Sequence, residues 1–397
     1  MSRINNRQLF LQHLAQTSSK PIGIEVANAK GIYINDVRDK EYIDLISGFS
    51  VCNIGHSHPK VIEAIEKQIH DYMHVIVYGE FIQNPQVQYA QLLTQYLPSF
   101  LDCVYFTNSG AEATEGAMKL AKRVTGRSKI FSFKGGYHGS TQGALSVMGD
   151  EYFKNAFRPL LPDVYQFEYN HKEIFSHIDA TVAAVIVEVV QAESGIQPAT
   201  IQWLQELSST CKNAGALLIV DEIQSGFGRT GSLFAFESYS IEPDILLLGK
   251  ALGAGLPLGA FIASHQKMHF LTNDPVLGHI TTFGGNPVSC AAGMAGMQVL
   301  IESNWMASVR EKELYLVTHL RHQAIQHRSH KGLWMSLTFE NDTMAKAIAA
   351  KCIENGLITD WFLFAENKIR IAPPLCITMD ELKKVVELMI KSIDQVI

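Results

Sequence analysis

The sequence predicts an α/β fold built on a largely parallel sheet. In the middle of the chain, short runs rich in Val, Ile and Leu alternate with longer stretches of helical periodicity. Several of these runs are continuously apolar, which is typical of strands buried on both faces of a parallel sheet. The chain has 397 residues, of which 47% are hydrophobic and 18% are charged, so it is long enough for two or three globular domains.

Six strands are predicted for this sheet, in chain order, at Cys103–Thr107, Lys129–Phe133, Ala183–Glu188, Ala216–Val220, Asp244–Leu248 and Gly259–Ala263. The clearest helices between them are expected at Ala111–Val124 and Thr200–Asn213. A long helical stretch from about Pro287 to Arg328 follows. A last set of strands and helices, typical of a smaller α+β lobe, is predicted at Gly332–Phe339, Thr343–Asn355, Lys368–Ile371 and Asp380–Ile393. The opening of the chain, with a strand signal at Gly31–Asn35, could join that lobe.

Composition and charge argue against several classes of partner. The chain has 33 Lys and Arg against 39 Asp and Glu, a net charge of −6, and no basic tract, so we expect no nucleic acid and no anionic membrane as partner. No apolar run approaches the ~20 residues of a membrane span, and the first residues lack the apolar stretch of a secretory signal. Six cysteines without paired spacing are typical of reduced, cytoplasmic thiols. His56 and His58 have no third ligand nearby, so no metal site is expected.

The segment after the first predicted strand is a candidate phosphate site. The residues TNSGAE at 107–112 open a helix, and free backbone N–H groups at the positive end of a helix dipole bind phosphate. The same residues also fit an ordinary helix cap, with Asn108 or Ser109 as the capping residue and Glu112 completing a capping box. Both readings stay open for this segment alone. The glycine signatures of nucleotide sites, GxxxxGK[ST] and GxGxxG after a strand, do not occur.

Two further segments place charged residues at the ends of buried strands. Asp221 and Glu222 follow the apolar run at 217–220, at the carboxyl end of a strand, where open α/β sheets bind their ligands. Asp221 could instead cap a turn, and Glu222 is expected to be structural. Lys250 follows the apolar run at 245–248 inside a Gly/Ala-rich loop. A lysine held in apolar surroundings has a lowered pKa and can form a Schiff base with a carbonyl.

Together the three segments predict a site for pyridoxal 5'-phosphate (PLP). The cradle at the helix start would hold the phosphate, an acid would keep the ring nitrogen protonated, and the lysine would hold the aldehyde. The 29 residues that separate Asp221 from Lys250 leave room for one crossover between neighbouring strands. A nicotinamide oxidoreductase would need a glycine fingerprint that is missing, and a non-catalytic binding protein would lack one of these three segments.

At this point the chain resembles the class III PLP-dependent aminotransferases of fold type I, which include the acetylornithine, ornithine and 4-aminobutyrate enzymes. The resemblance runs from about Gly23 to Leu375. The motifs that carry it are FTNSGAEATEGAMKLAKR (106–123), GGYHGS (135–140), LLIVDEIQSGFGRTG (217–231), LLLGKALGAGLPLGA (246–260), HITTFGGNP (279–287) and IRIAPPL (369–375). It implies a transaminase that moves an amino group from an amine or (ω-)amino acid to a 2-oxo acid in two stages.

The resemblance also implies a role for each matching residue. Lys250 would hold the cofactor and move the substrate proton, and Asp221 would pair with the ring nitrogen. Further cofactor contacts would come from Ser109, Gly110, Ala111, Tyr137, Gln224 and Thr282. Arg370 would bind a substrate carboxylate, and Glu193 would pair with it when no carboxylate is present. Thr282 would contact the phosphate of the cofactor in a neighbouring subunit, which implies a homodimer with sites at the subunit interface.

The implied fold is a large domain at 51–295 with a mostly parallel seven-stranded sheet. A small α+β domain would be formed by residues 296–397 together with the segment 1–50. One departure concerns substrates, because Ser140 stands where the named enzymes carry an arginine that contacts a substrate carboxylate. We therefore expect weak use of substrates that need this second carboxylate contact. The alternatives on the same fold are an aminomutase of the glutamate-1-semialdehyde type, disfavoured by Arg370, and a PLP-dependent decarboxylase, disfavoured by Phe49.

Overall fold

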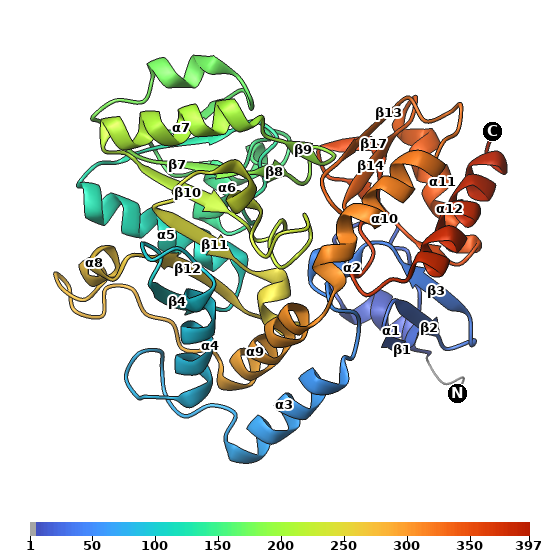
Figure 1. Cartoon of the computed structure of the whole chain (residues 1–397), viewed down its shortest axis with the longest axis horizontal. Coiled ribbons are helices and arrows are strands. Elements are labelled where there is room, and N and C mark those ends of the chain that lie inside the picture. Colours follow the sequence, from blue (N-terminus) through green and yellow to red (C-terminus); the bar gives the residue numbers. More distant parts are fainter. Residues whose placement is uncertain (1–4) are drawn as a thin grey trace.

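The predicted sheet forms the centre of the larger lobe in a computed structural model that describes residues 5–397 (Figure 1). Its strands lie in the spatial order β4 (Cys103–Thr107), β12 (Gly259–Ala263), β11 (Ile245–Leu248), β10 (Leu217–Asp221), β7 (Val182–Glu188), β5 (Lys129–Phe133) and β6 (Val164–Phe167). All neighbours pair in parallel except β12, which is antiparallel to both β11 and β4. The predicted α/β class and the mostly parallel, seven-stranded sheet are confirmed.

The sheet is buried on both faces because helices cover each side. Along β7, Ala184 and Ile186 pack in one cluster with helix α5 (Gly110–Thr125), while Val185 and Val187 pack in another with α7 (Ile201–Ala214). Successive side chains of a strand point to opposite faces, so a strand between two helical layers must be apolar throughout. The short edge strand β6 escaped prediction because its residues are only partly buried and carry no continuous apolar run.

The smaller lobe joins the two ends of the chain. One sheet has the order β1 (Val26–Lys30), β2 (Tyr33–Asp36), β3 (Glu41–Asp44) and β15 (Leu357–Ile358), with β3 and β15 parallel. A second sheet has the order β13 (His327–His330), β14 (Met335–Thr338), β17 (Ala365–Ile371) and β16 (Trp361–Phe362). Helices α11 (Asp342–Glu354) and α12 (Met379–Asp394) pack beside these sheets, and α1 (Asn6–His13) and the C-terminus lie on this side (Figure 1).

The predicted helical stretch is divided into α9 (Pro287–Glu302) and α10 (Trp305–His319), and it ends in strand β13. Helices α3 (Pro59–Asp71) and α4 (Asn84–Gln95) both pack against α9. The domain division at residues 50 and 295 stays a prediction; α9 continues through residue 295. No helix described between residues 5 and 397 combines the length and the apolar character needed to cross a membrane.

Candidate active site

A cavity of about 210 Å³ lies where β7, β10 and β11 end and α5 begins. The carboxyl ends of parallel strands meet at this edge of the sheet, which is where open α/β sheets bind ligands. Six of the residues singled out from the sequence line this one cavity: Gly110, Ala111, Tyr137, Asp221, Gln224 and Lys250. Segments separated by up to 140 residues of chain therefore converge as the sequence predicted.

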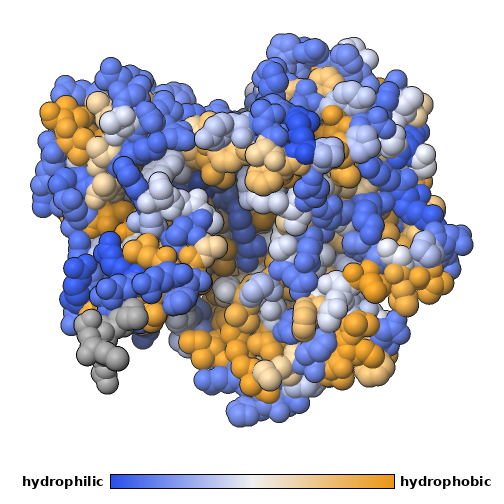
Figure 2. Space-filling view, turned by 180° about the vertical axis from the view of Figure 1, so that it is seen from behind, coloured by the Kyte–Doolittle hydropathy of each residue, from blue (hydrophilic) through white to orange (hydrophobic). Residues whose placement is uncertain are grey.

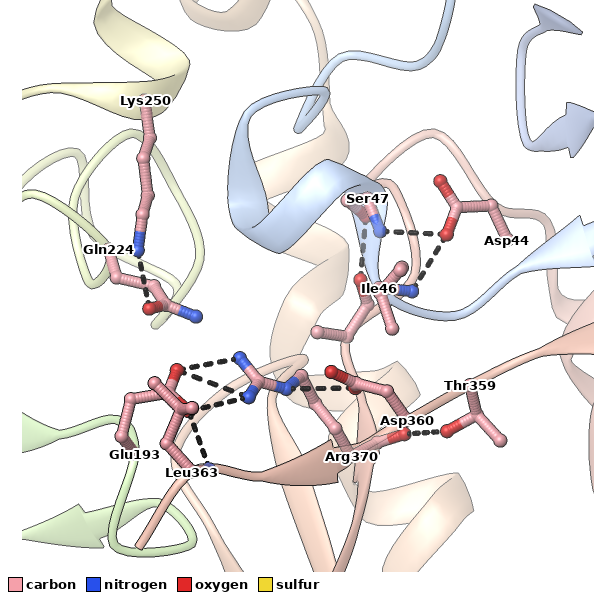
Figure 3. Close-up of polar contacts among 11 residues, drawn as sticks. Asp44, Ile46, Ser47, Glu193, Gln224, Lys250, Thr359, Asp360, Leu363 and Arg370 are labelled. Carbon is pink, nitrogen blue, oxygen red and sulfur yellow. Dashed lines mark hydrogen bonds and ion pairs between the residues drawn. The ribbon is translucent and has the colours of Figure 1, made fainter. Parts of the chain in front are cut away.

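Lys250 stands directly after β11 with its amine inside the site. Its Nζ donates a hydrogen bond to Oε1 of Gln224 over 2.6 Å, and Figure 3 shows this side chain pointing toward Gln224. The backbone of Lys250 has a φ of 49°, in the left-handed region that non-glycine residues rarely adopt. Burial lowers the pKa of the amine to about 8, against opposing attraction from Glu193. About a tenth of Lys250 is therefore neutral and nucleophilic at pH 7, far more than of a lysine whose pKa is 10.5.

Asp221 ends β10 at the bottom of the cavity, with 4% of the residue exposed. Its Oδ1 accepts the N–H of Ile223 at 2.9 Å, and its Oδ2 lies 2.7 Å from Nδ1 of His138. Burial alone would lower the pKa of His138, but the hydrogen bond and charge of Asp221 outweigh it and raise that pKa. The raised pKa favours the charged imidazolium, whose Nδ1–H donates to the Asp221 carboxylate and orients it.

Glu188 is a site residue that the sequence analysis missed. It ends β7 directly beside Asp221 in the parallel ladder and lines the same cavity. Its carboxylate accepts the N–H groups of Tyr137 (2.9 Å) and Ala192 (3.0 Å), and burial raises its pKa to about 7. An acid after a buried apolar run was the signal used for Asp221, and the run VAAVIVE carries the same signal.

The tip of α5 leaves backbone N–H groups free at the cavity. Ser109 is the capping residue, and its Oγ accepts the N–H of Glu112 at 3.1 Å. The N–H groups of Gly110 and Ala111 have no hydrogen-bond partner within residues 5–397, so they are available to an anion. A Cβ on Gly110 would lie 2.8 Å from Cδ1 of Ile223, so only glycine lets the helix tip come this close to the loop after β10. The predicted cap at Ser109 is present, and the two amides beside it remain free for an anion, so the phosphate site stays a prediction.

These residues fit PLP. The two free N–H groups at the positive end of α5 suit its phosphate, the carboxylate of Asp221 suits a protonated ring nitrogen, and the Lys250 amine suits its aldehyde. The side-chain amide Nε2 of Gln224 is buried without a hydrogen-bond partner among the described residues and lies at the same cavity. An oxygen substituent of a bound ring would satisfy this orphaned donor.

Arg370 and Glu193 form an ion pair on the far side of Gln224 from Lys250 (Figure 3). Both Nη atoms of Arg370 donate to the Glu193 carboxylate at 3.0–3.1 Å, and the guanidinium is fully buried. Burial would raise the pKa of Glu193, but the charge of Arg370 outweighs it and holds that pKa below its usual value. The structure thus brings together the two residues that the resemblance pairs, which are 177 positions apart in sequence.

Aromatic side chains cluster beside the cavity, and Tyr137 is the member of this cluster that lines it. The Tyr137 ring lies 6.4 Å from that of Phe364, which lies 5.4 Å from that of Phe153. The Tyr137 hydroxyl and Ser140 Oγ are 3.2 Å apart, so Ser140 sits at the mouth with a short polar side chain. Among the described residues, Lys250 is the only lysine or arginine that lines the cavity itself.

Thr282 does not reach the cavity of its own chain. It is exposed on the loop between η5 (His269–Leu271) and α9, while its neighbour Thr281 accepts a hydrogen bond from Asn108 at 3.2 Å. Around this loop, large apolar side chains are exposed on two adjoining segments; we call them the apolar face, formed by Met73, Val75, Phe81, Ile82, Val276, Leu277, Ile280 and Phe283. The segments are joined by the Tyr78 N–H, which donates to the Thr281 carbonyl at 3.2 Å.

Comparison with known proteins agrees with this geometry. A family model described as aminotransferase class-III matches residues 14–393. The chain is 36% identical to an acetylornithine aminotransferase of Archaeoglobus fulgidus over 96% of this chain and 98% of that one. It is 38% identical to an acetylornithine aminotransferase of Bacillus cereus over 94% and 95% of the two chains.

Solved structures resemble the whole fold. The ornithine aminotransferase of Toxoplasma gondii, described with partial occupancy of PLP at its active site, superposes with a TM-score of 0.91 at 28% identity. The match covers 99% of this chain and 95% of that one. An (S)-enantioselective omega-transaminase from Thermomicrobium roseum superposes with a TM-score of 0.91 at 25% identity, over 98% of each chain.

Proposed function

The chain belongs to the class III aminotransferases and is a PLP-dependent transaminase, and from this premise we propose the residues, substrates and assembly with which it works. The observation that carries the proposal is the juxtaposition of a desolvated amine, the Asp221 carboxylate and two free helix-tip amides around one cavity. No observation favours the aminomutase or decarboxylase alternatives.

We assign the proton transfers to two residues. Bound PLP supplies an electron sink that weakens the bonds at the carbon carrying the amino group. Lys250, whose lowered pKa of about 8 leaves about a tenth of the amine neutral at pH 7, would take the proton from that carbon and pass it to the cofactor, so that the amino group stays there. Asp221, oriented by its contact with His138, would hold a proton on the ring nitrogen and so sustain the sink. The amides of Gly110 and Ala111, with the capping Ser109, would hold the phosphate, and Gln224 and Tyr137 would orient the ring.

Arg370 would bind the carboxylate of a 2-oxo acid acceptor. A guanidinium binds a carboxylate through two parallel N–H···O bonds, and Glu193 occupies those same donors when no substrate carboxylate is present. A donor without a carboxylate would leave Glu193 in place. One pocket could therefore accept carboxylate and non-carboxylate substrates in turn.

We propose a donor with an apolar body that needs no carboxylate contact at the position of Ser140. Ser140 offers no charge for such a contact, and the neighbouring Tyr137 ring, which lines the cavity, belongs to an aromatic cluster with Phe364 and Phe153. The second candidate donor is acetylornithine, which the 36% and 38% identical relatives name. The acceptor in either case would be a 2-oxo acid.

A donor panel separates the two candidates. Arylalkyl amines, ω-amino acids and acetylornithine would be tested with pyruvate and with 2-oxoglutarate, and kcat/KM compared. We expect the highest values for donors with an apolar body and at least a tenfold lower value for acetylornithine, because losing one charged carboxylate contact costs about 1.5–3 kcal/mol. Acetylornithine as the best donor would overturn the proposed substrate class and leave the transaminase unaffected.

We further propose a homodimer that buries the apolar face. Figure 2 shows apolar side chains gathered on the lower part of the larger lobe, and isolated monomers rarely expose patches of this kind. Thr282 lies between Ile280 and Phe283 of this face, which would carry it to the phosphate of the partner's cofactor. The spread of free cysteines supports a reducing, cytoplasmic location.

A further inference from the structure

Arg370 has a second acidic partner, which no sequence motif indicated. Its Nε lies 3.2 Å from Oδ1 of Asp360, while its two Nη atoms face Glu193. The guanidinium faces are covered as well, because its carbon lies 4.4 Å from the ring centre of Phe362 and 4.9 Å from that of Phe49. The guanidinium is therefore contacted on both faces, along its Nη edge and at Nε, where the contact with Asp360 is an ion pair and not an aligned hydrogen bond.

The two acids differ in how they are attached to Arg370. Asp360 belongs to the same hairpin, and its carbonyl accepts the backbone N–H of Arg370 at 2.9 Å. Figure 3 shows Asp360 beside Arg370. Phe362 also comes from this hairpin. Glu193 reaches across from the loop between β8 (Val190–Gln191) and β9 (Gln197–Pro198). When a substrate carboxylate displaces Glu193, Asp360 and Phe362 can stay where they are.

We propose that Asp360 is the positioning residue that keeps the Nη edge of Arg370 directed at the substrate while Glu193 and the substrate carboxylate exchange. This rests on the proposed role of Arg370. Without an anchor on Nε, a guanidinium released by Glu193 could turn about its last side-chain bonds and lose its two-bond geometry. Asp360 also leaves the buried cation paired at the moment when Glu193 departs, which avoids an uncompensated buried charge.

The charge and the geometry of Asp360 are separable. Glu193 and a substrate carboxylate take the same position against Asp360, so the repulsion from Asp360 weakens both alike and largely cancels in the exchange. Asp360→Asn keeps an oxygen for Nε and removes the charge, whereas Asp360→Ala removes the anchor. The side-chain geometry, and not the charge alone, should decide how tightly an acid substrate binds.

The test follows the two half-reactions of the holoenzyme separately by the absorbance of the cofactor. Pyruvate tests the acid-binding half, and an arylalkyl amine without a carboxylate tests the other half. In Asp360→Ala we expect the half-saturating pyruvate concentration to rise about tenfold, the loss of one charge-assisted contact, with the value for the amine unchanged. Asp360→Asn should recover most of the affinity for pyruvate. The matched control is Glu366→Ala, an exposed acid of the same hairpin that pairs with Lys346 and not with Arg370.

Two results would overturn the inference: an equal rise for pyruvate and amine in Asp360→Ala, or no rise for pyruvate. If Asp360→Ala has a much lower melting temperature, Asp360→Ser can replace it, because serine keeps a polar side chain that is too short to reach Nε. We expect the same result for Asp360→Ser: a higher half-saturating concentration for pyruvate and an unchanged one for the amine. Arg370→Ala tests the underlying proposal by itself. If Arg370→Ala binds pyruvate as tightly as the wild type, the carboxylate role of Arg370 is refuted. If Arg370→Ala binds pyruvate more weakly while Asp360→Ala binds it normally, only the role of Asp360 is refuted.

Discussion

At the scale of single residues, the reactivity of Lys250 follows from its burial. Few polar groups replace water around its amine, so the charged form is disfavoured and the pKa falls from 10.5 to about 8. The negative charge of Glu193 works in the opposite direction and limits the fall. The balance between burial and Glu193 therefore sets the fraction of nucleophilic amine.

The first prediction concerns this amine. In cofactor-free protein, the rate of PLP uptake should rise with pH to a plateau with a midpoint near 8, because only the neutral amine attacks the aldehyde. Below the midpoint the rate should fall about tenfold per pH unit. Glu193→Gln removes the charge that favours the ammonium form, so its midpoint should lie lower. Stopped-flow absorbance measures both, and a midpoint near 10.5 would show that the amine is not desolvated.

Ser140 supplies the second prediction. Ser140→Arg places a cation at the mouth of the cavity, so kcat/KM for acetylornithine should rise about tenfold or more, by the 1.5–3 kcal/mol of a charge-assisted bond. Donors without a carboxylate should gain nothing. The control is Ser140→Gln, which is long and uncharged. An equal gain for the Gln variant would mean that length, and not charge, limits this substrate.

At the scale of elements, the segment α2 (Ser47–Ser50) is the most strained part of the site. All four residues have φ between 49° and 65°, so the chain makes a left-handed turn. Of the four, only Gly48 adopts this conformation without steric strain. The turn persists because Asp44 accepts the N–H groups of Ile46 (2.8 Å) and Ser47 (2.9 Å), and Ser47 donates to the Ala372 carbonyl at 2.6 Å. Figure 3 shows these contacts beside Arg370. The strain brings Phe49 onto the guanidinium.

Ser50 allows the third prediction. Its φ is 65° and its buried Oγ has no hydrogen-bond partner among the described residues, so Ser50→Gly removes about 1–2 kcal/mol of strain and an unsatisfied hydroxyl. The added entropy of the unfolded chain costs about 0.5–1 kcal/mol. We expect a net stabilisation of about 1 kcal/mol, measured as a higher melting temperature. Ser50→Ala is the control, since it removes the hydroxyl and keeps the strain. Destabilisation by glycine would show that the turn is not strained at this residue.

At the scale of the whole molecule, the assembly decides whether each site is complete. Thr282 is exposed and outside its own cavity, and the apolar face around it is unusual for a monomer. If this face joins two copies, each cavity is built from both chains. A loss of association would then remove activity without any change inside the cavity.

The fourth prediction is complementation between two inactive variants. Lys250→Ala removes the reactive amine, and Thr282→Asp places a negative charge where the partner's phosphate would lie. In mixed dimers, one of the two sites combines an intact Lys250 with an intact Thr282 from the other chain, so activity should return toward a quarter of the wild-type value on equal mixing. If Thr282 acts within its own chain, no site is intact and no activity returns. Ile280→Asp should shift the protein toward the monomer in light scattering and serves as the control for association.

Much of the fold could be predicted because its signals are local. Strands β4, β5 and β12 have the predicted bounds, since continuous apolar runs and the turns that end them lie within a few residues of sequence. Partly buried strands such as β6 and β13 lack that signal and were missed. Lys250 and Asp221 were found for the same reason, as charged residues directly after buried runs.

The sequence by itself determined the fold class, the cofactor and the residues at the strand ends. It did so because chain order and burial place these residues on one edge of a parallel sheet. Only the tertiary structure decided which polar groups become partners: His138 with Asp221, Glu188 beside it, and Asp360 with Arg370 opposite Glu193. Such pairs join segments up to 177 residues apart. Their hydrogen bonds depend on differences of an ångström that packing fixes and that no local pattern records.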